Sequence, residues 1–194
     1  MNDFLWKVKA KLYRLMRSCF PFNLVVKSEN KRLEWILQSV EITGKKVVDL
    51  GTGTGNVLQF LTHANPVLAI DITFTMLQAA RQLYPNSKFI QADALNLPLK
   101  TNAVDVIIAI GLSEYVSNID SLFKEISRLL KIGSFLILTF SPGGIWSRVR
   151  LLLGHSIYPR TLDDLLKVAS EEQFQLVKNS RSMMQGQVLF QKVN

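Results

Sequence analysis

An apolar run that leads directly into three alternating glycines constrains the fold of this chain more than any other feature. Residues 47–56 read VVDLGTGTGN. The valines and the leucine are typical of a strand buried on both faces. The glycines lack Cβ atoms, so the backbone can approach a ligand closely and adopt torsion angles that other residues avoid. We expect a helix over Gly55–His63 whose positive amino end faces that ligand. The segment therefore predicts a nucleotide-type binding loop.

The glycine spacing distinguishes between the nucleotide ligands that such a loop can bind. A nicotinamide or flavin fingerprint requires G-x-G-x-x-G, and Gly51 and Gly53 fit it, but Asn56 stands at the third glycine position. A Walker loop is excluded because no Gly-Lys-Ser or Gly-Lys-Thr occurs in the turn. The string from Asp49 to Gly55, Asp-x-Gly-x-Gly-x-Gly, resembles motif I of the class I S-adenosylmethionine-dependent methyltransferases.

Two further acids follow in the order that this resemblance implies. The apolar run 66–71 ends in Asp71, where the family has an acid that accepts hydrogen bonds from both ribose hydroxyls of the cofactor. Segment 89–98 is similar to the family's third-strand region, so Asp93 would accept from the adenine amino group, with the N–H of Ala94 nearby. An alternative stays open for both acids, because aspartate often caps a helix or turn.

The resemblance thus implies S-adenosylmethionine as cofactor and a set of binding residues around the ends of the first four strands. We expect Asp49, inside the first strand, to brace the loop rather than touch the ligand, and Thr73 to cap the second helix. The full predicted set is Asp49, Gly51, Thr52, Gly53, Gly55, Asn56, Asp71, Ile72, Met76, Asp93, Ala94 and Gly111.

The fourth strand, 104–111, runs into Leu-Ser-Glu-Tyr, where the family places the methionine end of the cofactor and the substrate. A methyl group on a sulfonium is already activated, so its transfer requires alignment, exclusion of water and a deprotonated nucleophile. A base with a pKa near the working pH would be a histidine. We therefore predict His155 as a candidate base, and Glu114 and Tyr115 as residues that orient the acceptor. No metal site is predicted.

The whole chain is interpreted as one α/β domain. Apolar strands alternate with amphipathic runs, which indicates a parallel sheet covered by helices on both faces. The resemblance implies a Rossmann-like, seven-stranded, mostly parallel sheet whose last strand inserts antiparallel. We divide the domain into 1–28, an amphipathic lid or membrane-contact segment; 29–140, the cofactor-binding core; and 141–194, the substrate lid and final strands. The expected helices are Asn30–Glu41, Gly55–His63, Thr73–Leu83, Asn118–Lys131 and Thr161–Glu172.

The positive charge is concentrated in the flanks of the chain. Of the formal net charge of +8, residues 1–34 contribute +5 and residues 141–194 contribute +3, whereas residues 35–140 are neutral. Cys19 is the only cysteine, so no disulfide framework is expected and a reducing, cytoplasmic setting is favoured. No apolar stretch reaches the roughly 20 residues of a spanning helix, and cations interrupt any signal-peptide core near the N-terminus.

Residues 3–20 have the pattern of an amphipathic helix, with apolar and aromatic side chains on one side and most cations on the other. Such a helix can lie at an anionic membrane surface, or it can cover the cofactor cleft, and the two interpretations are compatible. Segment 145–154 is also apolar, with two arginines. Apolar side chains from both flanks would then line the acceptor pocket, which predicts a lipophilic acceptor such as a prenylated ring, a polyketide or a lipid headgroup with its tails.

Two other classes of function stay open. The basic flanks would suit an RNA or protein methyltransferase, since cations bind phosphates without reading bases. However, no Asn-Pro-Pro-Tyr or Asp-Pro-Pro-Tyr follows the fourth strand, and no Pro-Cys occurs for attack on cytosine C5. A cofactor-binding regulatory subunit without turnover is the third interpretation. We predict a methyltransferase that acts on a small acceptor.

Overall fold

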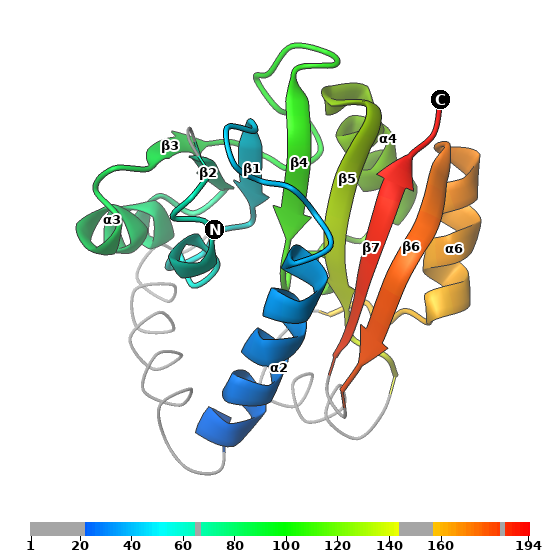
Figure 1. Cartoon of the computed structure of the whole chain (residues 1–194), viewed down its shortest axis with the longest axis horizontal. Coiled ribbons are helices and arrows are strands. Elements are labelled where there is room, and N and C mark those ends of the chain that lie inside the picture. Colours follow the sequence, from blue (N-terminus) through cyan, green and yellow to red (C-terminus); the bar gives the residue numbers. More distant parts are fainter. Residues whose placement is uncertain (1–21, 65–66, 144–156, 183–184) are drawn as a thin grey trace.

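A seven-stranded sheet forms the centre of the protein, in the strand order β3-β2-β1-β4-β5-β7-β6 (Figure 1). The computed structural model describes residues 22–64, 67–143, 157–182 and 185–194. The strands are β1 (Val47–Leu50), β2 (Val67–Asp71), β3 (Lys88–Gln91), β4 (Val104–Ala109), β5 (Leu130–Phe140), β6 (Phe174–Arg181) and β7 (Gly186–Lys192). The α-helices are α2 (Phe22–Leu37), α3 (Phe74–Leu83), α4 (Ile119–Leu129) and α6 (Leu162–Glu171), and single 3₁₀ turns are η1 (Leu58–Phe60) and η2 (Ser113–Tyr115).

The strand directions confirm the predicted fold class. The pairs among β1, β2, β3, β4 and β5 are all parallel, and β7 runs antiparallel between β5 and β6. All four residues of β1 are buried, as are five of the six residues of β4. Burial on both faces explains why these strands read as continuous apolar runs rather than as alternating patterns.

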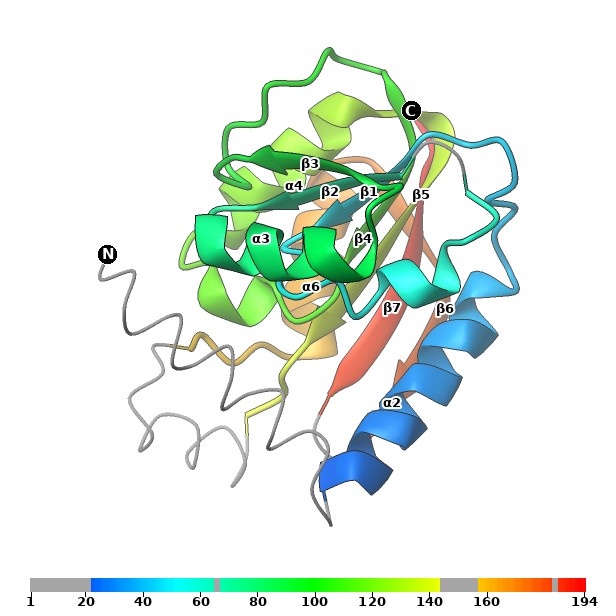
Figure 2. The same cartoon turned by 90° about the vertical axis from the view of Figure 1, so that its left-hand side faces the viewer.

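Helices cover both faces of the sheet (Figure 2). On one face, α4 and α6 pack on a core in which the ring of Phe123 meets those of Phe174 and Phe190 edge to face, with centroids 5.9 and 6.0 Å apart. On the other face, Leu33 and Ile36 of α2 pack with the η1 region against the sheet. Each face therefore has its own apolar core, which holds the sheet rigid at the edge where the loops carry the candidate site.

Three of the expected helices form where the sequence predicted them. Thr73 occupies the N-cap position of α3, although its side chain makes no cap hydrogen bond. The side chain of Asn118 caps α4 by accepting from the N–H of Ser121, and Thr161 forms a reciprocal capping box with Asp164 at α6. Such caps satisfy amide groups that the first turn leaves without a partner.

The helix predicted over Gly55–His63 is wrong. After the glycine loop the chain forms turns and then only η1, and the amides of Gly55 and Leu58 donate to carbonyls three residues earlier. Gly55 has φ +83°, a left-handed conformation that cannot begin a right-handed helix. The donors available to a ligand here are therefore the amides of a turn, and not the amino end of an α-helix.

The helix predicted over Asn30–Glu41 begins earlier and ends earlier, at Phe22 and Leu37. The predicted boundary between residues 28 and 29 therefore falls inside α2. Arg32 donates to the Ser180 hydroxyl at 2.9 Å, and the amide of Gln187 donates to the Glu29 carbonyl at 3.1 Å. These bonds to β6 and β7 hold the helix on the sheet, which its amphipathic pattern alone does not specify.

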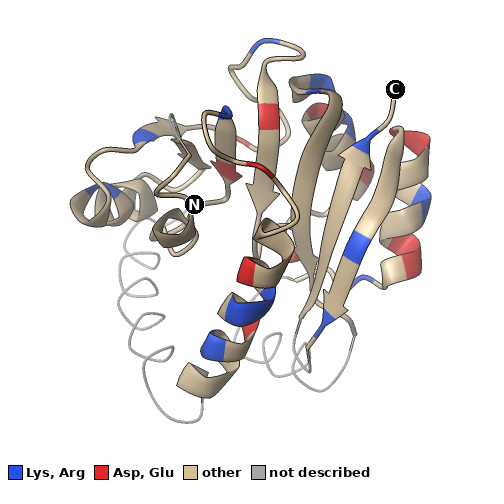
Figure 3. Cartoon of the chain, viewed as in Figure 1, with Lys and Arg blue, Asp and Glu red and all other residues tan. Residues whose placement is uncertain are grey.

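Helix α2 and strand β6 both carry Lys or Arg positions (Figure 3). The Lys178 ammonium lies 3.4 Å from the centroid of the Trp35 ring and donates to the Trp35 carbonyl and the Ser39 hydroxyl.

The amphipathic helix predicted over residues 3–20 lies outside the described residues. Within the described residues, no helix has both the length and the apolar composition needed to cross a bilayer.

Candidate cofactor and acceptor site

The loops after β1, β2 and β4 meet at one edge of the sheet because these strands are parallel neighbours. Leu50 pairs with Ile70, and Asp49 pairs with Ile108. The amides of Gly51 and Thr52 both donate to the carbonyl of Ile70, at 2.8 and 3.0 Å. The glycine loop is therefore fastened to the end of β2, where Asp71 stands. This edge is where open α/β sheets bind ligands.

The three loop glycines have positive φ angles, of +73°, +55° and +83° for Gly51, Gly53 and Gly55. A Cβ on Gly51 would lie 3.0 Å from the side chain of Leu112, and a Cβ on Gly55 would lie 2.9 Å from the ring of Tyr84. A Cβ on Gly53, by contrast, would have no atom of the described residues within 4 Å apart from those of its chain neighbours. Gly51 and Gly55 thus serve the packing of the loop, while Gly53 leaves its backbone open to a ligand.

Asp71 ties the glycine loop to the start of α3. Its Oδ2 accepts from the N–H of Gly53 and its Oδ1 accepts from the N–H of Thr73, both at 2.8 Å. Burial raises the pKa of the Asp71 carboxyl, and the two amide hydrogen bonds oppose that rise. Each carboxylate oxygen accepts more than one hydrogen bond, so the group can hold the loop and still accept from a ligand's hydroxyls.

Asp49 lies beneath the loop and is 1 % exposed. The Thr52 hydroxyl donates to its Oδ2 at 2.5 Å, which connects the strand to the loop that follows it. Burial raises the pKa of Asp49 to about 7, with a further rise from the neighbouring Asp71 carboxylate, whereas the hydrogen bond from Thr52 lowers it. The negative charge of Asp71 therefore disfavours ionisation of Asp49, although the glycine loop separates the two acids in the sequence.

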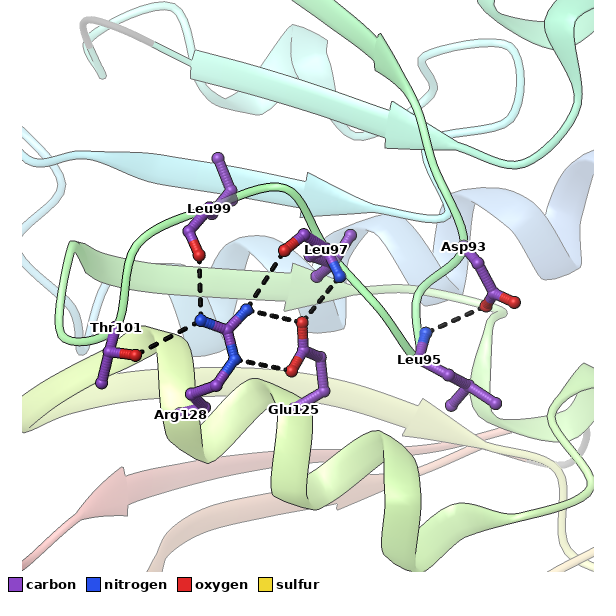
Figure 4. A network of polar contacts seen from close by, with 7 residues as sticks. All are labelled: Asp93, Leu95, Leu97, Leu99, Thr101, Glu125 and Arg128. Carbon is purple, nitrogen blue, oxygen red and sulfur yellow. Dashed lines mark hydrogen bonds and ion pairs between the residues drawn. The ribbon is translucent and has the colours of Figure 1, made fainter.

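The loop after β3 carries Asp93, which is exposed and accepts from the N–H of Leu95 at 2.9 Å (Figure 4). This is the turn-capping geometry that aspartate commonly adopts. The amide of Ala92 donates to the carbonyl of Asp71 at 3.1 Å. The loops after β2 and β3 consequently lie together, and the exposed side chains of Ile72 and Leu95 belong to this part of the edge.

An arginine of α4 holds that loop in place, and the sequence reasoning did not identify it. Arg128 donates to the carbonyls of Leu97 and Leu99 at 3.1 and 2.9 Å, and it pairs with Glu125 at 2.7 Å (Figure 4). Glu125 in turn accepts from the N–H of Leu97 at 2.7 Å. The only sequence signal is the spacing of two opposite charges on one helix face, which many solvent-exposed helices share.

The loop after β4 carries the residues predicted to orient the acceptor. Gly111 has φ +71° and its N–H donates to the Thr139 hydroxyl at 2.6 Å, while Ser113 donates its hydroxyl to the Thr139 carbonyl at 2.7 Å. Glu114 is buried, whereas Tyr115 is 41 % exposed. This loop is therefore anchored to β5, and it presents Tyr115 at the surface. His155 lies outside the described residues.

The other predicted residues lie at the same edge. Thr52 is buried in the loop, Asn56 is half-buried after it, Met76 is half-buried in the first turn of α3, and Ala94 follows Asp93. The structure thus brings together the predicted residues that it describes. Two further residues were not predicted from the sequence: the buried Arg160 and Thr139. Both form hydrogen bonds with main-chain groups that are far away in the sequence, so no local pattern indicates their roles.

A sheet with one reversed strand between β5 and β6, and a glycine loop and acids at its carboxyl edge, defines a Rossmann-like methyltransferase fold. The S-adenosylmethionine-dependent methyltransferase of Mesorhizobium loti has a TM-score of 0.70 at 19 % identity, over 80 % of this chain and 95 % of that one. Magnesium protoporphyrin IX methyltransferase of Synechocystis PCC 6803 has a TM-score of 0.77 at 17 % identity, over 98 % and 97 % of the two chains. These similarities show the fold.

Sequence comparison finds related proteins over part of the chain. Residues 48–138 match the family described as a methyltransferase domain. The demethylmenaquinone methyltransferase of Thermotoga maritima is 33 % identical over 138 residues, which are 69 % of this chain and 58 % of that protein. A malonyl-[acyl-carrier protein] O-methyltransferase of a Marinomonas species is 35 % identical over 107 residues, 51 % of this chain and 39 % of that protein. Residues 48–138 thus belong to the methyltransferase-domain family, in agreement with the predicted class I S-adenosylmethionine-dependent methyltransferase. The chain spans less than two thirds of the length of these two relatives.

Proposed function

We propose that this chain transfers a methyl group from S-adenosylmethionine to a small, lipophilic acceptor. The observation that carries the proposal is the glycine loop, which is open at Gly53 and fastened by Asp71 at the carboxyl edge of the sheet. The relatives named above are a demethylmenaquinone methyltransferase and a malonyl-[acyl-carrier protein] O-methyltransferase.

The residues at the edge fit the cofactor. The open backbone at Gly53 leaves room for a ligand against the loop, and Asp71 supplies carboxylate oxygens suited to ribose hydroxyls. The exposed apolar side chains of Ile72 and Leu95 would contact the adenine ring, with Asp93 at its amino group. When bound, the cofactor supplies an electrophilic methyl group on a sulfonium.

The acceptor would lie against the loop after β4. Tyr115 and Tyr158 expose 41 % and 44 % of their surface there, and the N–H of Tyr158 donates to the carbonyl of Glu114 at 2.7 Å. Aromatic side chains at a site favour a planar or apolar acceptor over a strongly hydrated one. We assign orientation of the acceptor to Glu114 and Tyr115, and proton removal to His155 for acceptors that need a base.

The division of the chain into a flank, 1–28, a core, 29–140, and a lid with the final strands, 141–194, is part of the proposal, with α2 crossing the boundary between flank and core. A lipophilic acceptor is best reached from a membrane surface, so we place the protein in the cytoplasm with a peripheral position on anionic membrane. Removal of residues 1–21, which leaves α2 whole, should abolish salt-sensitive sedimentation with anionic vesicles. Equal sedimentation of the two forms would contradict membrane contact through this flank.

The test of the function is a transfer assay with methyl-labelled S-adenosylmethionine and three groups of acceptors. The first contains demethylmenaquinone and malonyl thioesters, the second contains polar metabolites, and the third contains RNA and protein substrates. Transfer confined to the first group supports the proposal, and transfer confined to either of the others refutes a lipophilic acceptor. Calorimetric binding of the cofactor without transfer to any group would indicate a regulatory subunit. Asp71→Ala is the matched control: methyl transfer that depends on bound cofactor should be lower in this variant.

A further inference from the structure

Arg160 is 8 % exposed, and its guanidinium donates four hydrogen bonds to main-chain carbonyls. One terminal nitrogen donates to Ser113 at 2.5 Å and Tyr158 at 3.1 Å, and the other donates to Val116 at 2.6 Å and Ser117 at 3.1 Å. Burial lowers the pKa of Arg160, and nearby carboxylates oppose that effect. A buried cation is retained only when its donors are satisfied, and here carbonyl oxygens satisfy them.

The carbonyls that Arg160 holds belong to two segments that meet at the predicted acceptor side. Segment 113–117 follows β4 and contains Tyr115, while segment 157–160 precedes α6 and contains Tyr158. The N–H of Arg160 also donates to the carbonyl of Ser141, at the end of β5, at 3.0 Å. One side chain and its own backbone therefore join the ends of β4 and β5 to the start of α6.

We propose that Arg160 is a positioning residue for the methyl acceptor, which it serves by fixing the wall formed by segments 113–117 and 157–160. This inference rests on the function proposed above. A guanidinium is a rigid planar fork whose two terminal nitrogens reach two carbonyls each, whereas an ammonium cannot span the same set. The positions of Tyr115 and Tyr158 consequently depend on this arginine, although it does not itself face the acceptor.

Arg128 provides a matched control. It also donates to main-chain carbonyls, those of Leu97 and Leu99, but they belong to the loop that carries the predicted adenine contacts. We expect Arg160→Lys to lower kcat/KM for the acceptor by about tenfold to a hundredfold, as a misplaced reacting group does, with the Kd for S-adenosylmethionine within about twofold of wild type. Arg128→Lys should instead weaken binding of S-adenosylmethionine and change the acceptor KM little.

Hydrogen exchange supplies a readout that does not depend on turnover. Amides of residues 113–117 should exchange faster in Arg160→Lys and at the wild-type rate in Arg128→Lys. If Arg160→Lys does not fold, Tyr158→Ala tests the same wall, because it removes an exposed ring and leaves the arginine bonds to the backbone intact. It should raise the acceptor KM without changing cofactor affinity.

Equal losses of cofactor affinity and acceptor kinetics in Arg160→Lys, or wild-type kinetics in both Arg160→Lys and Tyr158→Ala, would overturn the inference. A wild-type protein that transfers methyl to no acceptor would instead refute the proposed function. In that case hydrogen exchange alone decides the positioning role, and unchanged exchange of residues 113–117 in Arg160→Lys counts against it.

Discussion

Replacing Asp49 by asparagine should remove a pH dependence that this carboxyl group imposes on folding stability. Asp49 is 1 % exposed beneath the glycine loop, and burial raises its pKa from the ordinary value of 3.8 to about 7. Between these two values the folded state holds a proton that the unfolded state has released. The free energy of unfolding therefore falls as the pH rises through this interval, and it levels off above about pH 7.

The size of the effect follows from the two pKa values. The contribution of Asp49 to stability is complete below about pH 4, and most of it is lost by pH 8. Between pH 5 and pH 8 the loss amounts to about 2 to 3 kcal/mol. Asparagine does not titrate, and its amide oxygen can still accept from the Thr52 hydroxyl. The stability of Asp49→Asn relative to wild type should therefore increase by that amount over the same range.

The assay is urea unfolding of the cofactor-free protein at several pH values from 5 to 8 and constant ionic strength. Asp105→Asn is the control, and its stability relative to wild type should not change with pH over this range. Burial raises the pKa of Asp105, but the hydrogen bonds from Lys131 and the N–H of Lys46 outweigh it and lower the pKa overall. Its contribution to stability is fully present above the unfolded pKa of 3.8, so it stays constant from pH 5 to 8 and is lost only at lower pH. A stability difference for Asp49→Asn that does not change with pH would refute the reasoning.

Four more variants test the loop, the cofactor contact and the core. Asp71→Ala should weaken binding of S-adenosylhomocysteine by roughly 1 to 3 kcal/mol, the scale of a lost hydrogen bond to a charged group, and unchanged calorimetric affinity would contradict the ribose role. Gly53→Ala should lower stability by about 1 to 2 kcal/mol through its positive φ. Gly55→Ala should lower it further, because its Cβ would lie 2.9 Å from the Tyr84 ring, and the reverse order in urea unfolding would contradict this packing. Phe123→Ala should lower stability by about 3 to 5 kcal/mol, and a loss below about 1 kcal/mol would show that the aromatic core had closed over the cavity.

Local patterns in the sequence were enough to predict most of the elements, whereas the candidate site residues came from the resemblance to a family. The apolar run of β1 and the caps at Asn118 and Thr161 depend on neighbours within a few positions of the chain. Parallel pairing then brings the carboxyl ends of β1 and β2 to one edge, so the glycine loop and Asp71 meet as predicted. The same local reasoning failed after Gly55, since it could not foresee that a positive φ would replace the helix by turns.

The tertiary structure decided how the loops at this edge are held. Arg160 bonds to the carbonyl of Val116 across 44 residues of sequence, and Arg128 bonds to that of Leu97 across 31. Every residue has a main-chain carbonyl, so the pattern of side chains does not indicate which carbonyls accept these hydrogen bonds. The sequence therefore determined which chemical groups reach the edge of the sheet, because periodicity and spacing encode strands, caps and turns. Only the folded chain determined which arginines fix those groups in place, because that depends on distances between segments far apart in the sequence.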